Sequence, residues 1–148
     1  MKVKFTVLGE PRGKGRPIFS TFGGRVNART PEKTVEYENL IKAVYQRAHP
    51  DRRFADGAML DMRVVAFYKI PKSASHKQRT EMLSGGVRPT KTPDADNILK
   101  VVGDSLNGLA FRDDAQIVDT QIRKFYAAQP RIEVTIQQVG GGHEQMQI

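Results

Sequence analysis

The sequence contains no cysteine, which excludes a disulfide framework and a thiolate metal site. It has no apolar run close to the roughly 20 residues that span a bilayer. Its first ten residues, MKVKFTVLGE, also lack the apolar core of a signal peptide. We therefore expect a soluble, cytoplasmic protein with no membrane partner. Its 148 residues predict one domain, large enough to bury a hydrophobic core.

Acidic residues are absent from residues 11–30, which hold five basic ones. By contrast, the segment from Asp94 to Asp119 holds six of the sixteen Asp and Glu, and only two of the 24 Lys and Arg. The rest of the chain thus has 22 basic and 10 acidic residues, a net charge of +12 against +8 for the whole chain. Such a basic surface favours a polyanionic partner, most simply nucleic acid. The alternative is a basic protein whose lysines only solvate its surface.

Hydrophobic periodicity predicts a chain that mixes strands and helices, without internal repeats. Alternating apolar residues predict strands at 2–9, 58–70, 115–127 and 131–139, with 58–70 in the centre of the sheet. A short extended piece around 25–28 is predicted to form one arm of a hairpin. The expected fold class is α+β, with a mixed or antiparallel sheet of three to five strands packed with about three helices. The expected domain covers residues 1–139, and residues 140–148 are expected to form a flexible tail.

Three helices are predicted from caps and apolar stripes. The first has Thr30 as its N-cap, Pro31 as its first helical residue and an end before Pro50. Its expected buried stripe consists of Val35, Leu40, Val44 and, more loosely, Ile41. The second helix lies within 71–86, with Ser73 or Ser75 as its cap and Gly85 near its end. The third runs from Asp94 or Ala95 to Asn107, and its expected buried residues are Ile98, Leu99, Val102 and Leu106.

The third helix carries an acidic stripe. Asp96, Lys100 and Asp104 are spaced four residues apart, so they share one side of the helix. Asp94 can converge with Asp96 only if it precedes the first helical turn, and Pro93 favours this because it makes Thr92 extended. Two further acids, Asp113 and Asp114, lie in a separate loop or at the start of a strand.

Each of these residues also has a purely structural interpretation. Asp94 and Asp96 suit an N-cap and a first helical turn. Lys100 suits an ion pair with Asp96 or Asp104. The doublet of Asp113 and Asp114 suits a turn. None of these interpretations explains why all of the acids occur together.

A divalent hard cation explains the cluster, because Mg²⁺ prefers carboxylate, water and phosphate oxygens. Such an ion polarises a phosphodiester, and an adjacent lysine stabilises the developing negative charge. A local cluster of acidic residues within an otherwise basic protein therefore predicts a metal-dependent nuclease. The three histidines, His49, His76 and His143, lie near no serine that would act as a nucleophile.

Several motifs together resemble the RusA family of Holliday-junction resolvases. They are PDADNILKVVGDSLNG (93–108), DDAQIVD (113–119), GEPRGKGRP (9–17) and ARTPEKTVEYE (28–38). The resemblance covers roughly residues 4–136. It implies a homodimeric Mg²⁺-dependent endonuclease, with Mn²⁺ as a substitute. Such an enzyme cuts four-way DNA junctions by paired symmetric nicks that leave 5′-phosphate and 3′-hydroxyl ends. It also implies branched DNA rather than a small molecule as substrate, and a phage or prophage origin.

The resemblance also implies roles for single residues. The catalytic carboxylates and metal ligands would be Asp94, Asp96 and Asp114. Lys100 matches the essential lysine of the family, while Asp104 and Asp113 match recurrent acids with a supporting role. Four basic side chains are expected to contact DNA phosphates: Arg12, Lys14, Arg16 and Arg25. The rival functions are a nuclease for other branched DNA, such as flaps or forks, and a non-catalytic DNA-binding protein.

Overall fold

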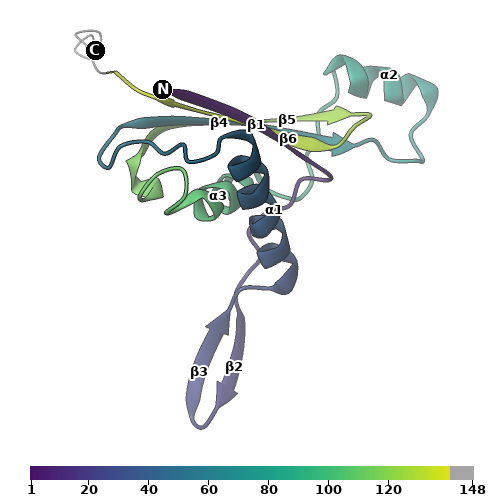
Figure 1. Cartoon of the computed structure of the whole chain (residues 1–148). Coiled ribbons are helices and arrows are strands. Elements are labelled where there is room, and N and C mark those ends of the chain that lie inside the picture. The colour runs from purple at the N-terminus through teal and green to yellow at the C-terminus, as the bar shows by residue number, and fades with distance from the viewer. Residues whose placement is uncertain (141–148) are drawn as a thin grey trace.

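A four-stranded sheet organises the structure, a computed structural model that describes residues 1–140 (Figure 1). Its strands are β1 (Lys2–Leu8), β6 (Arg131–Gln138), β4 (Leu60–Lys69) and β5 (Ile117–Ala127), in the order β1-β6-β4-β5. β1, β6 and β4 pair antiparallel, whereas β4 and β5 pair parallel. The sheet is therefore mixed, and the predicted α+β class and the inner position of β4 are confirmed.

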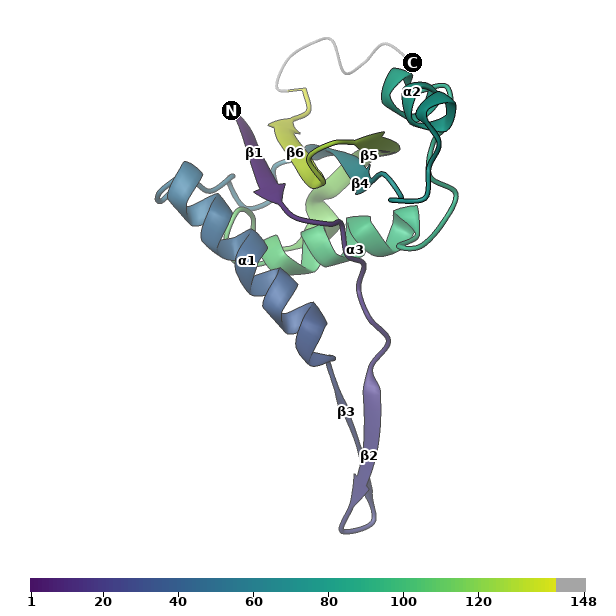
Figure 2. The same cartoon turned by 90° about the vertical axis from the view of Figure 1, so that its right-hand side faces the viewer.

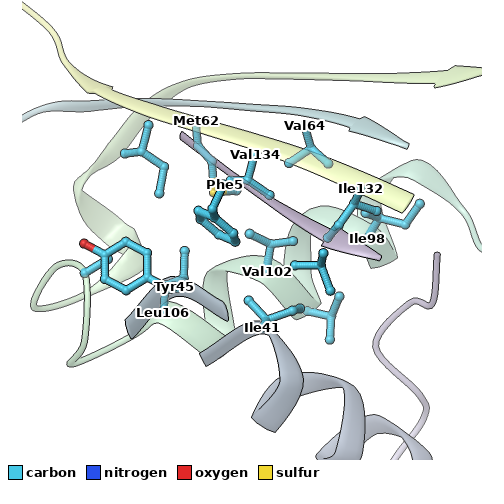
Figure 3. Close-up of a cluster of buried hydrophobic side chains, with 14 of the residues drawn as sticks. Phe5, Ile41, Tyr45, Met62, Val64, Ile98, Val102, Leu106, Ile132 and Val134 are labelled. Atoms are coloured by element: carbon cyan, nitrogen blue, oxygen red, sulfur yellow. The ribbon is translucent and has the colours of Figure 1, made fainter. Parts of the chain in front are cut away.

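Two helices cover one face of this sheet. α1 (Glu32–Ala48) and α3 (Ala95–Leu106) lie side by side beneath it, while α2 (His76–Ser84) lies beside β5 (Figures 1 and 2). The core fills the layer between the sheet and α1 with α3. There, Phe5, Val64 and Val134 face Ile41 and Val102 (Figure 3). Burying these apolar side chains stabilises the layer by roughly 1.5–3 kcal/mol for each large side chain.

The predicted caps of the second and third helices are confirmed. Ser75 accepts a hydrogen bond from the backbone N–H of Gln78, and Gly85 ends α2 in a left-handed conformation with φ of 83°. α3 begins after Asp94 and ends before Asn107. Among residues 1–140, no helix is both long and apolar enough to cross a bilayer. The predicted flexible tail lies outside the described residues, apart from Gly140.

The predicted buried stripe of α1 is wrong in part. Val35 and Leu40 are 40% and 43% exposed. The face that packs inward instead carries Thr34, Tyr37, Ile41 and Tyr45. The tyrosines bury their rings, and the Tyr45 hydroxyl donates to the carbonyl oxygen of Arg52 at 2.7 Å. A prediction that took only fully apolar side chains as buried therefore chose the wrong face. The helix also begins one residue later than predicted, with Pro31 rather than Thr30 as its N-cap.

A separate two-stranded hairpin projects from the body (Figures 1 and 2). It consists of β2 (Ile18–Phe22) and β3 (Arg25–Arg29), which pair antiparallel. The predicted extended piece at 25–28 is thus confirmed as one arm of this hairpin.

Candidate nuclease site

The start of α3 holds Asp94 in front of the first helical turn. Asp94 is the N-cap, with an extended backbone (φ −71°, ψ 153°), but its side chain makes no cap hydrogen bond. The Tyr68 hydroxyl donates to the carbonyl oxygen of Pro93 and so fixes the preceding residue to β4. Burial and then the Asp94 carboxylate raise the pKa of Tyr68, because both disfavour a phenolate there. The Asp94 carboxylate is therefore near β4 and available to a ligand rather than used as a cap.

One side of α3 carries Asp96, Lys100 and Gly103, at spacings of four and three residues. Asp96 and Lys100 are exposed. Among residues 1–140, no ion pair joins Lys100 to Asp96 or Asp104. The structural interpretation of Lys100 as an intrahelical ion-pair partner is therefore not realised.

Asp104 pairs with the basic N-terminal loop instead. The Nζ of Lys14 lies 3.2 Å from Oδ2 of Asp104 and 3.2 Å from Oε2 of Glu38. The backbone N–H of Lys14 also donates to the carbonyl oxygen of Asn97 at 3.0 Å. Next to it, a Cβ on Gly13 would lie 2.8 Å from the Cβ of Asn97, so only glycine fits this approach. Lys14 thus fastens the loop to both α1 and α3.

The two members of the acidic doublet have different environments. Asp113 caps the short 3₁₀ turn η1 (Asp114–Gln116): its Oδ1 accepts from the N–H of Ala115 at 3.1 Å. That hydrogen bond, followed by one with Asp114, lowers the pKa of Asp113. Burial, and then the carboxylates of Asp113 and Asp104, raise the pKa of Asp114. Asp113 therefore acts in the turn, while Asp114 carries uncompensated negative charge.

Asp114 faces the acid-bearing side of α3. Its backbone N–H donates to Oδ1 of Asn107 at 2.8 Å, and its Oδ2 lies 3.3 Å from where a Cβ on Gly103 would be. Together with Lys100 and Gly103 it lines a hollow of about 250 Å³, whose other lining residues are Met62, Leu99, Ile117 and Thr120. Sequence reasoning missed the roles of Gly103 and Asn107, although both lie within the matched motif.

The structure does not gather all predicted ligands at one point. Asp94 and Asp96 do not line the hollow, and Asp96 and Gly103 are roughly 10 Å apart along the helix axis. Within residues 1–140, no three His, Asp or Glu side chains lie together closely enough to hold a metal ion. The donor chemistry nevertheless fits Mg²⁺, which takes one or two carboxylates with waters and substrate phosphate oxygens. A cation would also offset the uncompensated charge at Asp114.

The expected DNA contacts lie on the N-terminal loop and the hairpin. Arg12, Arg16 and Arg25 are exposed. Lys14 differs, because its ammonium is engaged by Glu38 and Asp104. Of the described histidines, His49 hydrogen-bonds through Nε2 to the carbonyl oxygen of Lys4 at 2.8 Å, which is a structural contact.

Comparison with known proteins agrees with these motifs. The family described as "Endodeoxyribonuclease RusA" matches residues 9–137. The chain is also 38% identical over 139 residues to "Uncharacterized protein YqaN" of Bacillus subtilis (strain 168), an alignment that covers 93% of this chain and 96% of that protein. Because the family match covers most of the chain, including all of α3 and η1, the resemblance is confirmed. The chain belongs to the RusA family of endodeoxyribonucleases.

Proposed function

We propose that the protein is a homodimeric, Mg²⁺-dependent endodeoxyribonuclease of the cytoplasm that resolves four-way DNA junctions by paired symmetric nicks. The products would carry 5′-phosphate and 3′-hydroxyl ends. Family membership supports endodeoxyribonuclease action on Holliday junctions. The observation that carries the metal-dependent mechanism is the position of Asp114 beside Gly103 and Lys100, with burial and two neighbouring carboxylates raising its pKa.

In this proposal Asp114 would hold the divalent ion together with waters and phosphate oxygens of the substrate, and Asp94 and Asp96 are the further proposed ligands, with Mn²⁺ as a substitute ion. When bound, the ion would supply Lewis acidity toward the scissile phosphodiester and the leaving oxygen. Lys100 lies in the same hollow as Asp114 and directs its ammonium charge at the phosphate as negative charge accumulates there.

Asp104 and Asp113 support the site without touching the substrate. Asp104 holds Lys14 and through it the N-terminal loop. Asp113 caps η1 and so orients the backbone from which Asp114 projects. Asp104 pairs with Lys14 and Asp113 accepts from the N–H of Ala115, so Asp114 is the one of these three acids that is proposed to hold an ion.

The proposed substrate also accounts for the charge distribution and the dimer. Arg12, Arg16 and Arg25 contact phosphates and position the DNA without reading its sequence. Lys14 anchors the N-terminal loop that carries Arg12 and Arg16, because it is already paired with Glu38 and Asp104. A four-way junction has two-fold symmetry, so two coordinated cuts are made most simply by a two-fold dimer with one site per subunit.

A nicking assay tests the proposal. A mobile four-way junction and a linear duplex with the same arm sequences are incubated with the protein, with Mg²⁺ or with EDTA. We expect paired nicks in the junction with Mg²⁺, none with EDTA and little cleavage of the duplex. Preferred cleavage of flaps or forks would establish the rival nuclease specificity. Junction binding with no cleavage in Mg²⁺ or Mn²⁺ would establish a non-catalytic DNA-binding protein.

A further inference from the structure

The β2–β3 hairpin extends away from the rest of the protein (Figures 1 and 2). Every residue of both strands is exposed, and four of them are large apolar side chains: Ile18 (40%), Phe19 (67%), Phe22 (83%) and Val26 (71%). An isolated two-stranded hairpin is only marginally stable in water. An exposed arm of this composition therefore indicates a surface that is covered when the protein binds a ligand.

The root of the hairpin is fixed to α1 and to α3, the helix that carries part of the site. The backbone N–H of Gly15 donates to Oγ1 of Thr34 at 3.0 Å. A Cβ on Gly15 would lie 2.7 Å from that oxygen and 3.0 Å from Cγ of Pro31, so the loop lies directly on the start of α1. The backbone N–H of Lys14 donates to the carbonyl oxygen of Asn97, the residue after Asp96. The base of the hairpin is therefore held beside the candidate site.

The tip of the hairpin is tight and presents an aromatic side chain. Gly23 and Gly24 have φ values of 59° and 77°, which suit the two-residue turns that match the twist of the flanking strands. Phe22 and Arg25 are therefore still paired directly across the hairpin at its last rung. With 83% of its surface exposed, Phe22 is the most accessible of the large apolar side chains in residues 1–140.

The two faces of the hairpin differ in chemistry. Cross-strand partners share a face and successive residues alternate between faces. Phe22 with Arg25, Ser20 with Asn27 and Ile18 with Arg29 therefore form one face, which is aromatic at its tip and cationic along its length. The opposite face carries Phe19, Thr21, Val26 and Ala28. A phosphate-rich ligand suits the first face.

Charge decides between DNA and a second copy of the chain as the ligand. Residues 16–30 carry Arg16, Arg25 and Arg29 and no acidic residue. DNA is uniformly anionic and attracts this arm, whereas a second copy carries a net charge of +8 and offers less attraction. Aromatic side chains provide stacking surfaces for bases, and apolar wedges insert between base steps in bent DNA.

We propose that the hairpin is a branch-point wedge, in which Phe22 stacks between bases where the four DNA arms meet and Arg25 and Arg29 contact the flanking phosphates. This inference rests on the proposed function and deepens it by naming a source of junction selectivity. Unstacking a base step in linear duplex costs free energy, whereas at a branch point stacking is already interrupted. The wedge therefore favours the junction over duplex of the same sequence.

Fluorescence of 2-aminopurine tests the wedge, because this base analogue brightens when it loses its stacking neighbour. The analogue is placed beside the branch point of a four-way junction, and the protein is titrated in EDTA so that no cleavage occurs. We expect wild type to raise the fluorescence and Phe22→Ala to lose most of that rise. The preference of Phe22→Ala for junction over linear duplex should fall about tenfold, the size of one base–aromatic stack. Leu83→Ala, which removes a 55% exposed apolar side chain from α2, is the control and should behave as wild type.

Two further measurements keep the outcome decisive. Arg25→Ala should lower the slope of log affinity against log salt concentration by about one, as expected for one lost phosphate contact. Phe22→Ala should keep the wild-type melting temperature, since Phe22 lies outside the core. An unchanged fluorescence rise and junction preference in Phe22→Ala would overturn the wedge. A second pair of results would also overturn the wedge: Phe19→Ala loses the mass of the dimer in light scattering, and Phe22→Ala keeps the full fluorescence rise. The hairpin would then dock on a second copy of the chain.

The wedge and the proposed function fail in different ways. Wild type that nicks the junction, together with a Phe22→Ala variant that keeps the fluorescence rise, would overturn only the wedge. Wild type that brightens the analogue through Phe22 but never nicks in Mg²⁺ would overturn only the nuclease function.

Discussion

Gly103 of α3 and Asp114 of η1 lie directly against each other, since a Cβ built on Gly103 would be 3.3 Å from Oδ2 of Asp114. Asn107, the C-cap of α3, accepts a hydrogen bond from the N–H of Asp114 through Oδ1 and so brings η1 back onto the helix. The missing side chain at Gly103 therefore allows this carboxylate to reach the side of α3 that carries Asp96 and Lys100.

Replacing Gly103 with alanine should displace Asp114 by a few tenths of an ångström. We expect Gly103→Ala to slow junction nicking by about 10- to 100-fold, since small displacements at a reacting centre carry penalties of that size. Binding in EDTA should stay within about twofold, and the melting temperature should not fall, because alanine is the better helix former. Gly86→Ala is the control, as its nearest neighbours would lie at 3.5 Å. A wild-type nicking rate in Gly103→Ala would contradict the proposed role of Asp114.

Neutralising a proposed metal ligand should remove cleavage but not binding. Asp96→Asn and Asp114→Asn are each expected to slow nicking by at least about 10²- to 10³-fold, a loss typical of one major electrostatic contribution. Junction affinity in EDTA should persist or increase, because one negative charge near the phosphates is gone. Asp119→Asn, at an exposed aspartate of β5, should remain active. Full nicking by either test variant would remove that residue from the mechanism.

Lys100→Ala should affect the chemical step more than binding. The ammonium has no ion-pair partner in the described part of the chain and lines the same hollow as Asp114. We expect single-turnover nicking to fall about 100-fold while the dissociation constant in EDTA changes less than about threefold. Lys77→Ala on α2 is a charge-matched control. Equal losses in rate and affinity would show that Lys100 only attracts phosphate.

Much of the fold could be predicted because local signals and packing agree. The capping box of Ser75, the left-handed Gly85 and the apolar periodicity of α3 each act within a few residues. The strands could also be predicted, since their inward-facing apolar residues alternate with polar ones. The position of Asp94 before the first turn followed from its neighbour Pro93.

The rest depends on contacts between distant segments. The parallel pairing of β4 with β5 is not encoded in the alternation of either strand, so both a mixed and an antiparallel sheet were expected. The inward face of α1 depends on tyrosine rings that bury their apolar area, and the Tyr45 hydroxyl finds a partner in the carbonyl oxygen of Arg52. The pairing of Asp104 with Lys14 crosses 90 residues of chain, whereas the sequence suggested its helical neighbour Lys100.

This long-range pair supports a prediction about alkaline stability. Burial alone would lower the pKa of Lys14, but the hydrogen bonds to Asp104 and Glu38 outweigh it and raise the pKa above its usual 10.5. The folded state therefore holds this proton more tightly than the unfolded state. The stabilisation is fully present below pH 10.5 and is lost as the pH rises through the raised pKa.

Lys14→Met should consequently lower the melting temperature by about 2–4 °C at pH 7, because Glu38 and Asp104 are left close together without their cation. The difference from wild type should stay constant up to about pH 10 and shrink above it, as measured by circular dichroism. Lys42→Met, at an exposed position of α1, should match wild type throughout. A difference that is absent at pH 7 would mean that the close packing of Gly13 and Gly15 holds the loop without the ammonium. A difference that persists unchanged well above pH 10.5 would mean that the apolar stem of Lys14, rather than its charge, stabilises the crossing of α1 and α3.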